Sequence, residues 1–173
     1  KFGTFKIRSD TSDAANVSTA FERRDINYLL RLVRKLVSKG NKVLFLDIGA
    51  DLGGYSIIVA NYFRKDSVKI KCFEPVEVSC SLIRESLALN NIEGNVELFP
   101  VALLNEKDDH AEIKLDSVTP GSSSMTSGEE NRTVIIKTER LDDVIGDEIA
   151  EFDAVVCKID VEGVEQEVLE GAK

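Results

Sequence analysis

Cysteine, histidine and tryptophan are scarce in this sequence. The 173 residues include three cysteines, one histidine and no tryptophan, and no two cysteines have the C-x-x-C spacing. Structural zinc sites need clusters of such residues, so no metal site is predicted. Cys72 and Cys157 lie in apolar segments, and Cys80 lies in a predicted helix. We therefore expect buried, reduced thiols, which are typical of a cytoplasmic protein.

Long apolar runs and an excess of basic residues are also missing. No run approaches the ~20 residues that a membrane-spanning helix needs, and no secretory leader pattern is visible. The formal net charge is −9, which disfavours nucleic acid and anionic membranes as partners. We expect one domain with a sizeable core and no nucleic-acid or membrane partner, and the sequence leaves the oligomeric state open.

What the sequence does contain is an apolar strand that leads into a glycine turn and then a helix. Residues 43–46 form a short apolar run, Gly49, Gly53 and Gly54 follow, and residues 55–63 have the composition of a helix packed on a sheet. Glycine is needed where the backbone takes a positive φ or lets a ligand approach closely. A helix N-terminus adds unpaired N–H groups and a partial positive charge. The stretch therefore predicts a ligand site.

Two common phosphate-binding patterns are absent from this stretch. There is no G-x-x-x-x-G-K-[ST] sequence, and Asp51 stands where the second glycine of G-x-G-x-x-G would let a pyrophosphate approach. The nearby groups are acidic instead, because Asp47 ends one strand and Glu74 ends the next, residues 68–73. Carboxylates suit a ligand that carries an amine and a sulfonium. Glu74 follows the turn near the distance of ~20 residues expected of a carboxylate that binds a ribose diol.

Four segments together resemble the FkbM family of S-adenosylmethionine-dependent methyltransferases. They are Asp47 to Ser56, Phe73 to Pro75, Asn90-Asn91 and Lys158 to Gly163, and their order and spacing fit from about Arg8 to Ala172. The resemblance implies an α/β, Rossmann-like class I methyltransferase fold, with a mostly parallel sheet, helices on both faces and the first strand in the centre. It also implies S-adenosylmethionine as cofactor. We expect residues 1–40 to lead into the fold and residues 41–173 to form the cofactor-binding domain.

The predicted cofactor contacts lie in these segments and at the end of the third strand. Asp51 departs from the family pattern, which usually has asparagine there, and the added charge puts its contact to the methionine end in question. By the resemblance, the adenine lies beside Val101 and Leu103. The predicted cofactor-binding residues are Asp47, Gly49, Ala50, Asp51, Gly53, Tyr55, Ser56, Glu74, Pro75 and Ala102.

A second polar group follows the predicted fourth strand, residues 152–159. Lys158 and Asp160 face the same side because side chains alternate along a strand, and Glu162 follows. Helix capping by itself would explain the two carboxylates, but a lysine late in an apolar strand is costly unless it is paired. Ligands of open α/β sheets lie beyond the carboxyl ends of the strands. We therefore name Lys158, Asp160 and Glu162 as candidate catalytic residues.

Methyl transfer to a hydroxyl requires positioning and a proton acceptor. Asp160 or Glu162 is the candidate base, and Lys158 either orients a substrate oxygen or acts as base if burial lowers its pKa. The resemblance implies O-methylation of a hydroxyl on a sugar or polyketide-like small molecule. Three alternatives stay open: a divalent metal held by Asp160, an NAD-dependent oxidoreductase, and a binding module that keeps the fold without catalysis.

The remaining elements are assigned from periodicity. Residues 2–8 alternate as in an edge strand, residues 21–38 and 79–89 have helical spacing, and residues 96–103 form the third strand. Residues 111–115 and 133–138 are predicted strands, and residues 141–149 a short helix. Asp13 is interpreted as a helix cap that, by the resemblance, can also line the site. His110 is interpreted as a solvated side chain.

Two further expectations concern a loop and the chain ends. Residues 120–128 form a serine-rich loop, and by the resemblance Ser122 to Met125 lie near the substrate entrance. The chain begins without methionine and stops after the helix that follows the fourth strand. Methyltransferases of this fold continue with further strands, so we expect a longer protein whose C-terminal strands are missing here. The fourth strand would then have an exposed edge.

Overall fold

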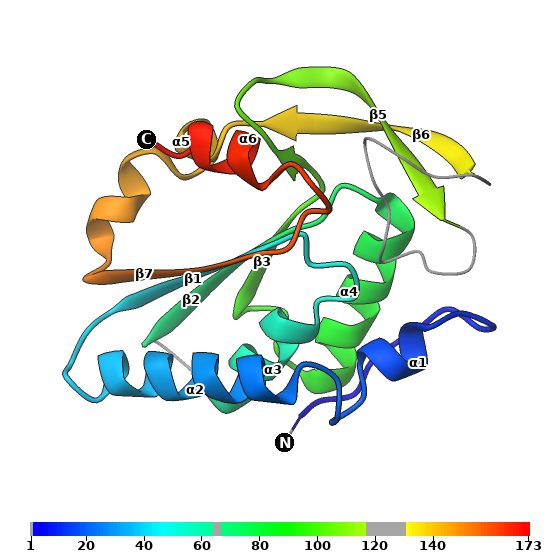
Figure 1. Ribbon diagram of the computed structural model, residues 1–173. Helices are drawn as coiled ribbons and strands as arrows, with labels where there is room; N and C mark the ends of the chain where they lie inside the picture. The colour runs from blue at the N-terminus through cyan, green and yellow to red at the C-terminus, as the bar shows by residue number, and fades with distance from the viewer. Residues whose placement is uncertain (1, 64–66, 117–130) are drawn as a thin grey trace.

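A four-stranded parallel sheet lies at the centre of the molecule (Figure 1). The computed structural model describes residues 2–63, 67–116 and 131–173. The strand order is β3-β2-β1-β7, with every neighbouring pair parallel. These strands are β1 (Val43–Ile48), β2 (Val68–Phe73), β3 (Val96–Phe99) and β7 (Ala154–Ile159). The central position of the first strand, which the resemblance implies, is confirmed.

Helices cover both faces of this sheet, and the side chains of β1 are buried on both sides. Val43 and Phe45 share a cluster with residues of α2 (Arg23–Val37), α3 (Gly54–Tyr62) and α4 (Glu77–Asn90). Leu44, Leu46 and Ile48 pack on the other face, toward α5 (Leu141–Ile145) and α6 (Glu165–Glu170). A strand covered on both faces needs a continuous apolar run, which is what residues 43–46 supply.

A second, three-stranded sheet lies beyond the carboxyl ends of the central strands, and its β5–β6 hairpin is seen at the top of Figure 1. It contains β4 (Ala102–Leu103), β6 (Asn131–Glu139) and β5 (Asp108–Asp116), in the order β4-β6-β5. The predicted third strand over residues 96–103 is therefore wrong as one element. Pro100 lacks an N–H for the ladder, and the chain leaves the first sheet after Phe99 to pair with β6 in the second.

The N-terminal segment differs from the prediction. Residues 2–7 form no strand, because α4 rather than another strand supplies their hydrogen-bond acceptors. The backbone N–H of Thr4 donates to Asn90 Oδ1 at 2.9 Å, and that of Lys6 donates to Ser86 Oγ at 2.8 Å. The short helix α1 (Asp13–Asn16) follows, without a side-chain cap. Asp13 is thus not a cap.

Three smaller expectations are also corrected or limited. The helix predicted over residues 141–149 ends at Ile145, and a 3₁₀ helix, η2 (Gly146–Glu151), continues from Gly146, whose φ is 50°. Cys72 and Cys80 are buried free thiols as expected, but Cys157 is exposed on β7. The serine-rich loop, with Ser122 to Met125, lies outside the described residues. No helix among the described residues is long and apolar enough to cross a membrane.

Candidate active site

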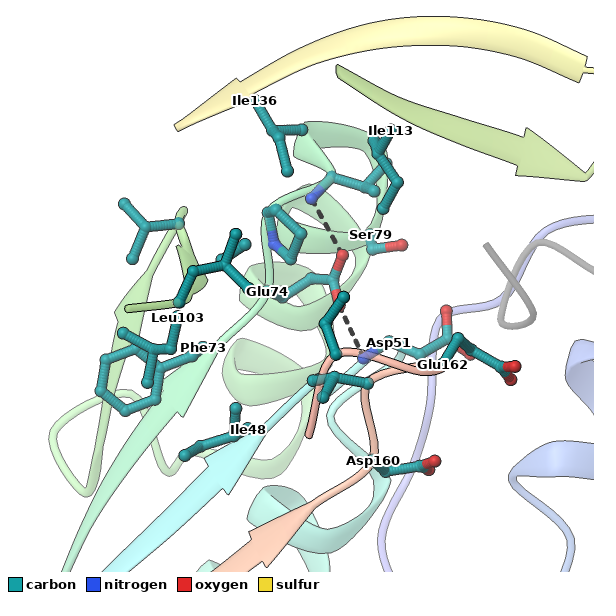
Figure 2. A pocket seen from close by; sticks show the side chains of 18 residues that line it. Ile48, Asp51, Phe73, Glu74, Ser79, Leu103, Ile113, Ile136, Asp160 and Glu162 are labelled. Carbon is teal, nitrogen blue, oxygen red and sulfur yellow. Dashed lines mark hydrogen bonds between the residues drawn. The ribbon is translucent and has the colours of Figure 1, made fainter. Parts of the chain in front are cut away.

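The predicted site residues meet at the carboxyl ends of β1, β2 and β7, where two pockets adjoin the glycine turn. We call one the hairpin pocket, because Ile113 of β5 and Ile136 of β6 line it together with Phe73, Glu74 and Leu103 (Figure 2). We call the other the N-terminal pocket, because Ser12, Phe21 and Glu22 line it together with Tyr55 and Lys158. Both pockets share Gly49, Asp51, Asp160 and Glu162.

Glu74 is a buried carboxylate in the wall of the hairpin pocket, with 6% of its surface exposed. Its two oxygens accept backbone hydrogen bonds of 2.9 Å from Asp51 and Val76 (Figure 2). Burial raises the pKa of Glu74 to about 7 against these favourable hydrogen bonds. The carboxyl group therefore changes its charge near neutral pH.

The glycine turn is held close to the segment after β7. Gly49 has a φ of 72°, and a Cβ placed on it would collide with the carbonyl group of Asp160. The N–H groups of Gly49 and Ala50 both donate to the carbonyl oxygen of Phe73 at 3.1 Å. Asp51 also has a left-handed backbone, with a φ of 47°, and its side chain lines both pockets. Only glycine fits at position 49, as the sequence pattern suggested.

Asp47 lies beneath the turn rather than in the wall of either pocket. Its Oδ2 atom accepts hydrogen bonds from the Ser56 backbone N–H at 3.0 Å and from the Ser56 hydroxyl at 2.7 Å. Its Oδ1 atom is buried without a hydrogen-bond partner. Gly53, which precedes α3 with a φ of 71°, likewise lies outside both pocket linings. Asp47, Ser56 and Gly53 therefore support the turn without lining either pocket.

Lys158 connects the turn to β7. Its Nζ atom donates to the Gly49 carbonyl at 2.6 Å and lies 3.5 Å from both Asp47 Oδ1 and Asp160 Oδ2. The same ammonium group lies 5.5 Å from the centre of the Tyr55 ring. Burial by itself lowers the pKa of Lys158, but the two carboxylates outweigh it and the pKa is raised. The condition under which Lys158 would act as a base, a lowered pKa, is therefore not met.

Asp160 and Glu162 are exposed carboxylates that line both pockets. The Asp160 side chain is 61% exposed, and Figure 2 shows the carboxylates of Asp160 and Glu162 pointing away from Glu74. Neither caps the next helix, since α6 begins at Glu165 with Val164 before it and has no side-chain cap. The capping interpretation is thus wrong. Both carboxylates line the two pockets, and that of Asp160 also pairs with Lys158.

Two residues of the site carry no signal in the sequence. Glu22 lines the N-terminal pocket with a φ of 43°, and it accepts a 2.7 Å hydrogen bond from the Tyr55 hydroxyl. Arg8 donates to Asp51 Oδ1 at 2.9 Å. No motif marks either residue, because both reach the site from the N-terminal segment through contacts distant in sequence. His110, by contrast, is exposed on β5 as expected.

The described residues contain no group of three or more His, Cys, Asp or Glu side chains arranged to hold a metal ion.

The remaining predicted residues fall into the pockets. Pro75 and Ala102 line the hairpin pocket with Glu74, and Ala50 and Tyr55 line the N-terminal pocket. The structure thus brings the glycine turn, the end of β2 and the segment after β7 to one place.

This arrangement defines a Rossmann-like α/β domain, and the candidate site lies at the carboxyl ends of its strands, where open α/β sheets bind their ligands. The family model of the methyltransferase FkbM domain matches residues 47–173, and the chain belongs to this family. A search of curated protein sequences gives no match.

Three solved structures are similar. The FkbM methyltransferase of Methylobacillus flagellatus has a TM-score of 0.48 and 17% identity, over 74% of this chain and 28% of that one. A proposed caffeoyl-CoA O-methyltransferase from Staphylococcus aureus has a TM-score of 0.40 and 19% identity, over 51% and 39%. A proposed O-methyltransferase from Klebsiella pneumoniae has a TM-score of 0.35 and 17% identity, over 55% of this chain and 36% of that one. The chain thus spans well under half the length of each.

Proposed function

We propose that this domain binds S-adenosylmethionine across the glycine turn and methylates a hydroxyl group of a sugar or polyketide-like small molecule. The observation that carries the proposal is Glu74, a buried carboxylate at the end of β2 in the wall of a pocket. Membership of the FkbM family supports the reaction class. A carboxylate in this place suits a ribose diol, because it can accept from both hydroxyl groups.

The residues of the two pockets fit the parts of this cofactor. Phe73, Val101 and Leu103 give the hairpin pocket an apolar wall that suits an adenine ring. The N-terminal pocket adds the carboxylates of Glu22, Asp160 and Glu162, which suit an amine and a sulfonium. We expect the adenosine portion beside Glu74 and the methionine portion beside Gly49, Ala50 and Asp51.

S-adenosylmethionine, when bound, supplies an electrophilic methyl group. The chain has to hold an acceptor hydroxyl against that group and remove its proton. Asp160 is the candidate base, since its carboxylate lines both pockets, and Glu162 is the second candidate. A positioned base contributes about 10²–10⁴-fold. Lys158 keeps its charge and holds the turn, and its Nζ can orient an acceptor oxygen.

The charges around the N-terminal pocket favour a neutral acceptor. Glu22, Asp160 and Glu162 contribute negative charge, whereas the cations of Lys158 and Arg8 already contact two carboxylates each. An anionic acceptor would therefore meet repulsion from these carboxylates. Hydroxyl groups can instead donate hydrogen bonds to these carboxylates. This supports an uncharged sugar or polyketide-like alcohol.

Isothermal titration tests the cofactor assignment. S-adenosylmethionine and S-adenosylhomocysteine are titrated into the protein, with NAD as the competing cofactor class. We expect micromolar binding of both methionine derivatives and its loss in Glu74→Gln. Glu77→Gln is the matched control, because Glu77 begins α4 but is exposed and pairs with Arg84.

Binding of NAD alone would overturn the proposal in favour of an oxidoreductase. Binding of S-adenosylmethionine without methyl transfer to any neutral alcohol would favour a non-catalytic binding module.

A further inference from the structure

Arg8 joins three segments of the chain at the site. Its Nε and Nη2 atoms donate to the two oxygens of Asp13 at 2.8 and 3.0 Å. The Nη2 atom also donates to Asp51 Oδ1 at 2.9 Å, and Nη1 lies 3.5 Å from Ser79 Oγ of α4. The side chain is only 17% exposed, and that of Asp13 is fully buried. A bidentate contact between buried partners fixes orientation as well as charge.

Asp51 connects Arg8 to Glu74. Its side chain is bound by Arg8, while its own backbone N–H donates to Glu74 Oε2 at 2.9 Å. A non-glycine residue in the left-handed region needs surrounding contacts to hold it there, and Asp51 has a φ of 47°. Arg8 binds the side chain of Asp51 and Glu74 accepts from its backbone N–H, so these two contacts hold Asp51 in that conformation.

Arg8 also balances charge at this place. Three carboxyl groups gather here: Asp13, Asp51 and Glu74. Burial raises the pKa of Asp51, Arg8 opposes that rise, and Asp13 adds to it. Asp51 in turn helps to raise the pKa of Glu74. Without Arg8, no cation beside Asp51 would balance its negative charge, which opposes the ionised form of Glu74.

We propose that Arg8 is a positioning residue of the cofactor site, which fixes Asp51 in the turn and thereby the N–H group that Asp51 donates to Glu74. This inference rests on the proposed function, because it assigns Arg8 a role in cofactor binding that extends beyond tying down the N-terminal segment. A purely structural tie would change stability alone.

The test is a set of variants measured for S-adenosylmethionine affinity and for amide hydrogen exchange of the turn, residues 49–53. Arg8→Gln is expected to weaken binding by at least about tenfold, the scale of a lost charged hydrogen bond, and to speed exchange at Asp51. Arg8→Lys keeps the charge without the fork geometry and should give an intermediate loss. Arg8→Lys also takes the place of Arg8→Gln in the test if Arg8→Gln folds poorly.

Two further variants separate positioning from general damage. Asp51→Asn removes the charge that Arg8 balances, so in the Arg8→Gln background it should recover most of the lost affinity. Arg84→Gln is the matched control, because Arg84 forms an exposed ion pair with Glu77 and should bind within about twofold of the unaltered protein.

The outcomes distinguish this inference from the proposed function. If the unaltered protein binds and the folded Arg8 variants bind equally well, with unchanged exchange, the role of Arg8 is structural and the inference is overturned. If the unaltered protein binds no S-adenosylmethionine, the proposed function fails. The role of Arg8 is then decided by amide hydrogen exchange at Asp51 alone. Faster exchange in Arg8→Lys supports the positioning of the turn by Arg8, and unchanged exchange overturns that role.

Discussion

Lys158 donates a 2.6 Å hydrogen bond from its Nζ atom to the carbonyl oxygen of Gly49. The parallel pairing of β1 with β7 sets Asp47 opposite Lys158, so the same ammonium group also lies 3.5 Å from the buried Oδ1 atom of Asp47. One largely buried cation therefore ties together the end of β1, the glycine turn and the end of β7.

Replacing Lys158 with methionine should destabilise the fold by about 3–5 kcal/mol, because Asp47 would keep a buried charge without that cation. Asp47→Asn in the same background should recover part of the loss. Urea unfolding at pH 7 measures both. Lys42→Met is the matched control, because Lys42 pairs with Glu151 at the surface, and should cost under about 1 kcal/mol. Equal losses for the two lysine variants would contradict the role of Lys158.

The pKa of Glu74 predicts how stability depends on pH. In the folded protein the pKa of the Glu74 carboxyl group is about 7, whereas its ordinary value is 4.5. Between these values the folded state binds more protons than the unfolded state, so stability falls as pH rises. The difference amounts to roughly 3 kcal/mol. Unfolding curves from pH 4.5 to 7.5 should show this fall in the unaltered protein but not in Glu74→Gln. Parallel curves for the two proteins would contradict the raised pKa.

The strand-turn-helix unit could be predicted because its signals are local. The apolar run begins at Val43 and the helix is expected over residues 55–63; β1 begins at Val43, and α3 spans Gly54–Tyr62. The network around Arg8 could not be predicted, because Arg8 and Asp51 meet only after the N-terminal segment packs against α4. The pKa of Lys158 also depends on a partner across the sheet, Asp47. The break after β3 does have a local signal, because Pro100 lacks an N–H for the ladder.

The close approach at Gly49 predicts a strong effect of one methyl group. Gly49→Ala would force a positive φ on alanine and push its Cβ into the Asp160 carbonyl. We expect a loss of at least about 2 kcal/mol and weaker cofactor binding. Gly54→Ala is the control, since nothing lies within 4 Å of a Cβ there and α3 begins at that residue. Thermal unfolding should show a lower Tm for Gly49→Ala and an unchanged or higher Tm for Gly54→Ala. Similar Tm values for both would contradict the close approach of the Asp160 carbonyl to Gly49.

The proposed base is tested by separating catalysis from binding. Asp160→Asn keeps the size of the side chain but cannot accept a proton, so kcat should fall by about 10²–10⁴-fold, while the Kd of S-adenosylmethionine changes little. The assay follows release of S-adenosylhomocysteine with a neutral sugar or polyketide-like alcohol found by screening. Glu165→Gln is the control, because Glu165 lies at the start of α6, outside both pocket linings.

A normal kcat in Asp160→Asn together with a large fall in Glu162→Gln would assign the base to Glu162, which lines the same two pockets. A normal kcat in both variants would overturn a carboxylate base. Positioning of the acceptor beside Lys158 would then have to account for the rate, as intramolecular geometry can in favourable cases. A fall in kcat in Glu165→Gln as well would show that the effect comes from the packing of the segment after β7 rather than from proton transfer.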